Sequence, residues 1–312
     1  MGKVAFLFDG QGCQYSGMGK ELFEECNDVH RFYGVAEAIR PGTLSQMFDG
    51  PEEELKKTSN TQPCMFLADI AGAMALMENG IVPDAVAGFS LGETVAMAIS
   101  GVLSKEEAFK VVCKRGKLMQ EAAEKSEGSM IAVLKMDKGQ LQDICEEIGV
   151  YPVNYNCPGQ IVVSGEKEKI DELKTQLESR KVRYIELSVG GPFHTPYMQD
   201  AVKALSKELS NKKLYNIHKT YIPLYANKTA QPYTESRSGI VETYCEQISN
   251  SVKWEDTLNN MAKDGVDTFI ECGPGKTLSG FVKRTLPEAK IYNVSDRASL
   301  QKTVTELCSA PN

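Results

Sequence analysis

A serine between two glycines stands where the sequence changes from a strand pattern to a helix pattern. Residues 88–92 are Gly-Phe-Ser-Leu-Gly, after an apolar run at 85–89 and before a helix-like stretch at 93–100. A sharp strand-to-helix turn lifts the serine oxygen off a sheet, and glycines on both sides avoid clashes. The N-terminus of the helix then offers backbone N–H groups to an oxyanion. The pattern predicts that Ser90 is a nucleophile; the alternative is an ordinary glycine turn with a helix-capping serine.

A serine nucleophile needs a base, and the chain has three histidines, His30, His194 and His218. His30 lies in an acidic segment typical of a solvated helix, and His218 follows a polar stretch typical of a surface connection. His194 lies in Gly-Gly-Pro-Phe-His-Thr-Pro, directly after a strand pattern, in a loop position where active-site groups collect. His194 is therefore the predicted general base. For a histidine without such a serine, a hydrogen-bonded structural role would be the better interpretation.

The elements around these residues predict an α/β fold. Strand patterns alternate with helix patterns along both ends of the chain, an order typical of a parallel sheet. The strands are expected at 3–8, 85–89, 221–225, 268–271 and 291–294, and the helices at 63–77, 93–100, 105–125, 202–210, 241–249 and 299–307. Pro63 suits the first turn of its helix, and Ser104 with Glu107 forms a capping box.

The middle of the chain follows a different order. Strand patterns at 130–136, 153–157, 161–164 and 183–189 enclose helix patterns at 138–148 and 166–180. This β-α-β-β-α-β order is the ferredoxin-like pattern. We therefore expect a small subdomain at 128–190, inserted into a larger unit that residues 1–127 and 191–312 form together.

The composition limits the classes of function. A chain of 312 residues with 42% hydrophobic and 25% charged residues is an ordinary globular one with a sizeable core. Its net charge of −7 argues against general binding to nucleic acid or to anionic membranes. The longest apolar segment, 65–77, is interrupted by Asp69 and is too short for a membrane span. Nine scattered cysteines without a CxxC pair or a Cys/His grouping favour a reducing cytoplasm, without a disulfide framework or a metal site.

These features combine into a family resemblance. The chain is similar to bacterial malonyl-CoA:acyl carrier protein transacylases and to the acyltransferase domains of polyketide and fatty acid synthases. The motifs that carry the resemblance, in the family's order, are Gly10-Gln11-Gly12-Cys13-Gln14, Thr61-Gln62-Pro63, Gly88-Phe89-Ser90-Leu91-Gly92-Glu93, Lys114-Arg115-Gly116 with Met119-Gln120, Phe193-His194-Thr195-Pro196 with Met198, Gln247 before Trp254, and Glu271-Cys272-Gly273-Pro274-Gly275-Lys276. No single motif is decisive, but the ordered set spans almost the whole chain and is highly specific. The resemblance implies an α/β-hydrolase-like core with an inserted ferredoxin-like subdomain, in agreement with the element order.

The resemblance also implies ping-pong acyl transfer that needs no metal or other cofactor. Ser90 would take the malonyl group from malonyl-CoA as an ester, with His194 as the base, and the phosphopantetheine thiol of acyl carrier protein would remove it. A backbone carbonyl near Gln247 would orient the histidine, so that serine and histidine form a dyad. The backbone N–H groups of Gln11 and Leu91 would stabilise the oxyanion. Nothing in this chemistry demands more than a monomer.

Two further residues concern the choice of substrate. By resemblance, Arg115 would grip the malonyl carboxylate with two parallel hydrogen bonds, which lysine cannot reproduce. Taken alone, it would be interpreted as a surface arginine on a lysine-rich helix. Phe193 matches the malonyl-selective form of the family's loop, where a bulky ring excludes a methyl branch; the alternative is a simple core phenylalanine. Phe89 departs from the pattern, because the family usually has histidine before the nucleophile.

Two other classes of function share some of these residues. A serine acyl hydrolase or thioesterase that acts on acyl carrier protein would also use Ser90 and His194, but a hydrolase of neutral acyl groups has no use for a buried cation at Arg115. A non-catalytic docking module would retain the fold and need none of the three. Labelling with radiolabelled malonyl-CoA separates these hypotheses.

Overall fold

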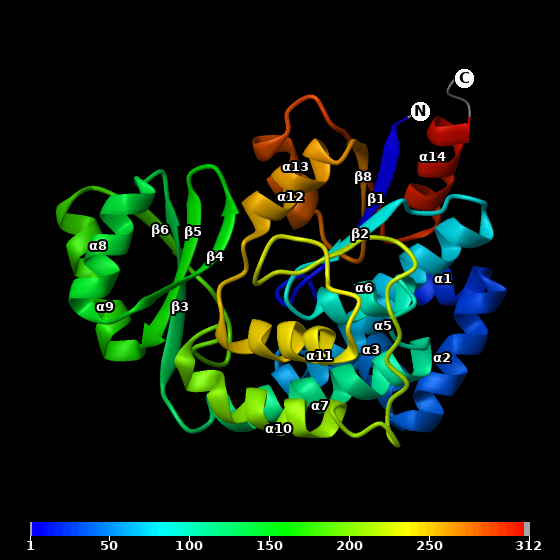
Figure 1. Cartoon of the computed structure of the whole chain (residues 1–312), viewed down its shortest axis with the longest axis horizontal. Coiled ribbons are helices and arrows are strands. Elements are labelled where there is room, and N and C mark those ends of the chain that lie inside the picture. The colour runs from blue at the N-terminus through cyan, green and yellow to red at the C-terminus, as the bar shows by residue number, and fades with distance from the viewer. Residues whose placement is uncertain (1, 309–312) are drawn as a thin grey trace.

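A five-stranded parallel sheet forms the centre of the larger part of the protein, in a computed structural model that describes residues 2–308. Its strands lie in the order β7-β2-β1-β8-β9 (Figure 1). Their bounds are Lys3–Phe8 for β1, Ala85–Gly88 for β2, Leu224–Tyr225 for β7, Val266–Cys272 for β8 and Lys290–Val294 for β9. Each neighbouring pair is parallel, so the carboxyl ends of all these strands meet at one edge of the sheet.

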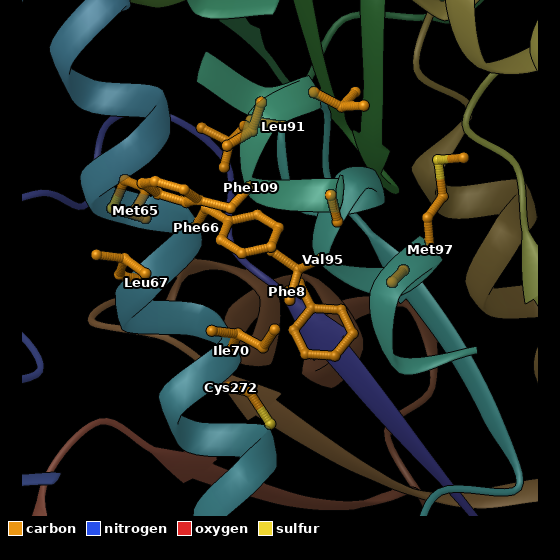
Figure 2. Packing of buried hydrophobic residues seen from close by; sticks show 14 of the residues in the cluster. Phe8, Met65, Phe66, Leu67, Ile70, Leu91, Val95, Met97, Phe109 and Cys272 are labelled. Atoms are coloured by element: carbon orange, nitrogen blue, oxygen red, sulfur yellow. The ribbon is translucent and has the colours of Figure 1, made fainter. Parts of the chain in front are cut away.

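Strand β1 is apolar along its length because both faces of the sheet are covered. Phe6 and Phe8 belong to one buried cluster, and Ala5 and Leu7 belong to a second cluster. Figure 2 shows part of the first cluster, where side chains of α5 (Thr58–Glu78) pack beside Phe8. Nearly every side chain of this helix is buried, which is why its sequence is apolar all round.

Helix α5 begins earlier than the sequence predicted. We expected its start at Pro63, but the first turn already closes where Lys57 O accepts the amides of Asn60 at 2.8 Å and Thr61 at 2.8 Å. Pro63 consequently lies inside the helix, where its missing N–H removes one backbone hydrogen bond. The extra turn brings Gln62 onto the same rigid helix as the buried residues that follow.

The other helices of this part surround the parallel sheet (Figure 1). Their bounds are α1 Lys20–Glu25, α2 Asn27–Ile39, α3 Thr43–Asp49, α4 Glu52–Leu55, α6 Gly92–Ile99, α7 Lys105–Ala123, α10 Gln199–Leu209, α11 Arg237–Glu246, α12 Trp254–Lys263, α13 Thr277–Thr285 and α14 Arg297–Cys308, with short 3-10 helices at Pro196–Met198 and Gln247–Ser249. The capping box predicted at Ser104 and Glu107 is present at the start of α7.

Two expectations need correction. The strand expected at 221–225 is reduced to Leu224–Tyr225, because Pro223 has no amide to donate and Tyr221 is 80% exposed. Helices α3, α4, α12 and α13 were not predicted, although the buried positions of α12, Trp254, Leu258 and Met261, recur with the period of an amphipathic helix.

Four antiparallel strands form the second sheet, at the left of Figure 1. The order is β4-β5-β3-β6, and the bounds are β3 Gly128–Leu134, β4 Tyr151–Cys157, β5 Gln160–Glu166 and β6 Arg183–Glu186. Helices α8 (Lys138–Ile148) and α9 (Lys167–Ser179) bury their apolar faces against it. The α/β class and the ferredoxin-like order are confirmed, while the proposed division at 128–190 stays a prediction. Within residues 2–308, no helix is both long and apolar enough to cross a membrane.

Candidate active site

Ser90 occupies a strained turn directly after β2. Its φ of 53° is in the left-handed region, which non-glycine residues rarely adopt. The two neighbouring glycines are required by space: a Cβ on Gly88 would lie 1.9 Å from the carbonyl carbon of Gly92, and a Cβ on Gly92 would lie 2.4 Å from Phe8 O. The G-x-S-x-G pattern therefore produces the expected turn, with the serine side chain at the carboxyl edge of the sheet.

His194 meets this serine from a sequence-distant loop. Its Nε2 lies 2.9 Å from Ser90 Oγ, and its Nδ1 lies 2.9 Å from Gln247 O. A carbonyl oxygen can only accept, so Nδ1 carries the proton and Nε2 is free to accept the serine proton. The other two histidines, His30 and His218, are exposed. The pairing expected from the sequence is thus the one that the fold brings together.

The surroundings of His194 favour its neutral form. Burial, helped by the positive charge of Arg115, lowers the pKa of His194 to about 4. An imidazole that stays neutral near physiological pH retains its capacity to take up a proton. The backbone carbonyl of Gln247, and not a carboxylate, holds the ring, so the geometry is that of a dyad.

Arg115 is fully buried beside the serine, contrary to the alternative of a surface arginine. Its Nη1 donates to Gln62 Oε1 at 2.9 Å, and its Nη2 donates to Gln247 Oε1 at 2.8 Å and to Ser90 Oγ at 3.2 Å. Burial lowers the pKa of Arg115 from its ordinary value. Its Nε has no acceptor among residues 2–308, so the guanidinium has spare donor capacity.

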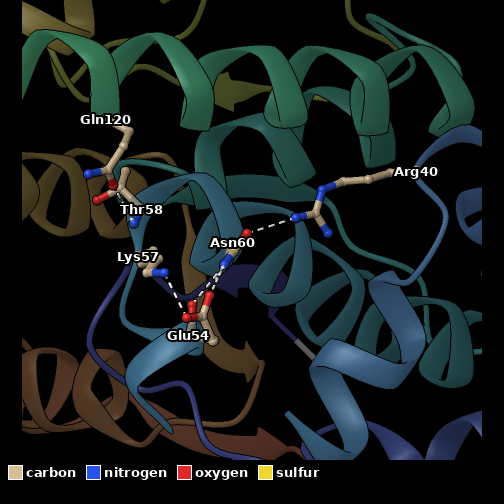
Figure 3. A network of polar contacts seen from close by, with 6 residues as sticks. All are labelled: Arg40, Glu54, Lys57, Thr58, Asn60 and Gln120. Carbon is tan, nitrogen blue, oxygen red and sulfur yellow. Dashed lines mark hydrogen bonds and ion pairs between the residues drawn. The ribbon is translucent and has the colours of Figure 1, made fainter. Parts of the chain in front are cut away.

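Polar contacts hold the start of α5, the helix that carries Gln62, and one of them comes from α7, the helix that carries Arg115. The side chain of Gln120 accepts the amide of Thr58 at 2.9 Å, so a residue of α7 satisfies the first turn of α5 (Figure 3). Asn60 adds hydrogen bonds to Arg40 and to the Glu54 backbone, at 2.8 and 2.9 Å. The network supplies the partners that the start of a buried helix needs.

The backbone amides of Gln11 and Leu91, which both border the cavity at Ser90, have no acceptor within residues 2–308. Gln11 follows β1 and Leu91 follows the serine, so the parallel sheet brings both to its carboxyl edge. Preorganised N–H groups of this kind suit a developing oxyanion. A cavity beside Ser90 has Gln11, Leu91 and His194 in its wall, together with Gln62, Phe89, Met119, Met130, Asn154, Leu187, Val189 and Phe193.

Ser90, His194 and the amides of Gln11 and Leu91 have an arrangement that suits acyl chemistry, and the sequence profile described as acyl transferase domain matches residues 5–307. The chain belongs to the acyl transferase family. It is 39% identical to the malonyl CoA-acyl carrier protein transacylase of Bacillus subtilis, over 98% of each chain. Among solved structures, the transacylase of the same name from Clostridium perfringens is 37% identical and covers 98% of this chain and 97% of its own, with a TM-score of 0.92. A malonyl-transacylase in complex with its type II PKS acyl-carrier protein is 31% identical, with coverage of 97% and 99% and a TM-score of 0.92.

The wall of the acyl transferase cavity includes both phenylalanines that the sequence singled out. Phe193 is buried directly before the base. Phe89, where the family usually has histidine, packs edge-on against Trp254 with ring centroids 5.4 Å apart and lies 6.3 Å from the ring of Phe281. An aromatic cluster therefore lies beside Ser90. No three His, Cys, Asp or Glu side chains within the described part of the chain are grouped to hold a metal ion.

Sequence reasoning assigned no individual role to two residues of this acyl transferase. Asn227 follows β7, and its Oδ1 accepts the amide of Ser90 at 2.7 Å while its Nδ2 donates to Gly88 O at 2.6 Å. The side chain thereby holds the strained turn at both ends. Glu93, the last residue of the serine motif, is fully buried, and its charge in an apolar helix was a usable signal. Asn227 gave no comparable signal, because its partners are distant in sequence.

Proposed function

We propose that the protein transfers the malonyl group of malonyl-CoA to the phosphopantetheine thiol of acyl carrier protein, through an ester on Ser90. The names of the relatives support this activity. Within this chain the observation that carries the proposal is the buried guanidinium of Arg115, at 3.2 Å from Ser90 Oγ. A fixed cation beside the nucleophile favours an acyl group with a carboxylate at its far end.

The first half-reaction begins at the serine oxygen. Ser90 Oγ attacks the thioester carbonyl carbon while its proton passes to His194 Nε2. The negative charge that develops on the carbonyl oxygen is stabilised by the amides of Gln11 and Leu91. The C–S bond then breaks, the imidazolium returns the proton to the CoA sulfur, and the malonyl ester remains on the serine.

The second half-reaction reverses these roles. The carrier thiol gives its proton to His194 and attacks the ester carbonyl, the C–O bond breaks, and Ser90 Oγ regains the proton. A second hollow beside the first offers the pantetheine arm a path, since it shares Gln11, Phe89, Asn154 and Leu187 with the cavity at the serine and adds Asn156, Gln160 and Thr277. Amide and hydroxyl side chains suit the amide groups of pantetheine.

The malonyl carboxylate requires a partner once it has left water. Arg115 supplies a charge and donors in a planar fork, and the carboxylate would exchange with the present contact to Ser90 Oγ. Phe193 borders the same space, so we expect it to disfavour a branched acyl chain. Gln62 and Gln247 would keep the guanidinium in place during the exchange.

Labelling with radiolabelled malonyl-CoA tests the proposal. We expect the wild-type protein to take up label that hydroxylamine releases, and to pass it to holo acyl carrier protein. Ser90→Ala should take up none, because no other residue is placed to hold the ester. Label that persists in Ser90→Ala would remove Ser90 from the role of nucleophile. Release of free malonate at the same rate with and without the carrier would support the hydrolase instead.

We also propose that the protein acts as a monomer, with residues 128–190 as an inserted unit. The proposed site takes its serine, base and guanidinium from one chain. Sedimentation at the concentration of the transfer assay tests this point. Activity confined to a dimeric fraction would contradict it.

A further inference from the structure

Glu93 is a fully buried carboxylate that the proposed reaction does not use. Its Oε2 accepts the backbone amide of Asn227 at 2.9 Å and Gln247 Nε2 at 3.1 Å. Its Oε1 accepts the hydroxyl of Tyr233. Every partner is a donor, which is the set that an ionised carboxylate requires.

These contacts fix the direction of the Gln247 amide. Because the carboxylate of Glu93 can only accept, Nε2 of Gln247 must face it, and Nε2 also donates to Ser90 O at 2.8 Å. The oxygen Oε1 is thereby turned toward Arg115, whose Nη2 donates to it at 2.8 Å. One amide side chain thus connects a buried anion to a buried cation.

Glu93 is the carboxylate among the groups that most affect the pKa of Arg115 within residues 2–308. The others are Tyr233 from the loop after β7, Tyr244 and Cys245 from α11, and His194. Burial raises the pKa of Tyr233 and Tyr244, raises that of Cys245 to about 12, and lowers that of His194 to about 4, so these groups are neutral. Glu93 is consequently the anion that balances the buried guanidinium most directly in the free protein.

We propose that Glu93 is the internal counter-ion of Arg115 and, through Gln247, a specificity-determining residue for acyl groups that carry a carboxylate; this rests on the proposed function. When a malonyl carboxylate reaches Arg115, two anions share one buried cation. Glu93 then takes up a proton from solvent, so that the site returns to neutrality. A neutral acyl group makes no such demand.

The pKa of Glu93 places its change of protonation state within the pH range of an enzyme assay. Burial raises it to about 7, while Tyr233, Asn227, Gln247 and Arg115 act in the opposite direction. Above that pH the carboxylate of Glu93 competes with malonyl for the guanidinium, and below it the competition is already relieved. The preference of the wild-type enzyme for malonyl-CoA over acetyl-CoA should therefore fall as the pH rises.

The first test compares Glu93→Gln with wild type in the ratio of kcat/KM for malonyl-CoA and acetyl-CoA. At about pH 8.5 we expect the ratio to be higher in Glu93→Gln, on the order of tenfold, and nearly independent of pH. Asp69→Asn is the matched control, since it makes the equivalent carboxyl-to-amide change at a buried side chain whose oxygens have no hydrogen bond to Arg115, Gln62 or Gln247 within residues 2–308. Its ratio should follow wild type. A ratio in Glu93→Gln that matches wild type at both acid and alkaline pH would overturn the proposal.

A second measurement needs no variant, in case Glu93→Gln does not fold. Mixing wild-type protein with malonyl-CoA in a weakly buffered indicator solution at about pH 7 should show proton uptake with formation of the ester, and acetyl-CoA should show none. Formation of the ester without proton uptake would overturn the proposal that Glu93 is the counter-ion of Arg115. If malonyl-CoA forms no ester at all, the proposed function fails instead, so the two failures are distinguishable.

Discussion

Replacing Arg115 by alanine should change the choice of substrate more than the ability to transfer an acyl group. Two charge-assisted hydrogen bonds to the malonyl carboxylate contribute about 1.5–3 kcal/mol each. The guanidinium already donates to Gln62, Gln247 and Ser90 Oγ, so part of that gain is an exchange of partners. We therefore expect the lower end of the sum, about 3 kcal/mol, or roughly a hundredfold loss of kcat/KM for malonyl-CoA.

Acetyl-CoA should respond in the opposite direction or not at all. A buried cation disfavours a neutral acyl group, and Arg115→Ala removes it. Arg115→Lys retains the charge but loses the planar fork, so it should recover only part of the malonyl activity.

The assay is the ratio of kcat/KM for the two thioesters in each variant. Arg40→Ala is a suitable control, because Arg40 also makes several side-chain hydrogen bonds, among them one to Asn60 at 2.8 Å in the network of Figure 3, but its partners are Thr43, Gln46 and Asn60 and do not include Ser90. Its ratio should equal that of wild type even if its stability falls. An unchanged ratio in Arg115→Ala would refute the assignment of this residue as the carboxylate clamp.

Three further predictions concern protonation and packing. The pKa of His194 is lowered to about 4, so a neutral fluorophosphonate should modify Ser90 at the same rate from about pH 7 to about pH 5. A decline of this rate centred near the ordinary histidine pKa of about 6.5 would contradict the prediction. Burial, with the nearby charges of Asp9 and Glu271, raises the pKa of Asp69 well above its ordinary value. The folded protein therefore holds a proton on Asp69 that the unfolded chain releases, and the free energy of unfolding falls as the pH rises. Urea unfolding should find Asp69→Asn more stable than wild type at about pH 8, by more than about 1 kcal/mol, and less dependent on pH; parallel pH curves would be the contrary result. Gly92→Ala places a Cβ 2.4 Å from a β1 carbonyl oxygen and should lower the free energy of unfolding by at least about 3 kcal/mol, as measured by thermal unfolding. Gly34→Ala in α2, where a Cβ has nothing within 4 Å, should be neutral or stabilising. Equal melting temperatures of the two variants would show that the turn can relax.

Local patterns in the sequence predicted much of the fold. Strand β1 and helix α8 have the bounds that their patterns predicted, Lys3–Phe8 and Lys138–Ile148. Both are well marked, since β1 is buried on both faces and α8 has a regular apolar stripe with an aspartate cap. The serine turn was predictable from its local pattern of two glycines, although only the contact that requires Gly88 is local, because Gly92 is required by the distant carbonyl of Phe8.

The sequence alone also determined that Ser90 and His194 are the candidates for chemistry, since Ser90 stands in a G-x-S-x-G turn and His194 directly follows a strand pattern. It could not determine what surrounds them. Whether Arg115 is a solvated arginine or a buried clamp depends on α5 and α7 packing together, and the roles of Asn227 and Glu93 depend on contacts across more than a hundred residues. Hydrogen-bond partners and burial are properties of the folded chain, because the sheet brings together strand ends that are far apart in sequence. Local composition does not encode those neighbours, and they decide the charge, the orientation and the specificity of the site.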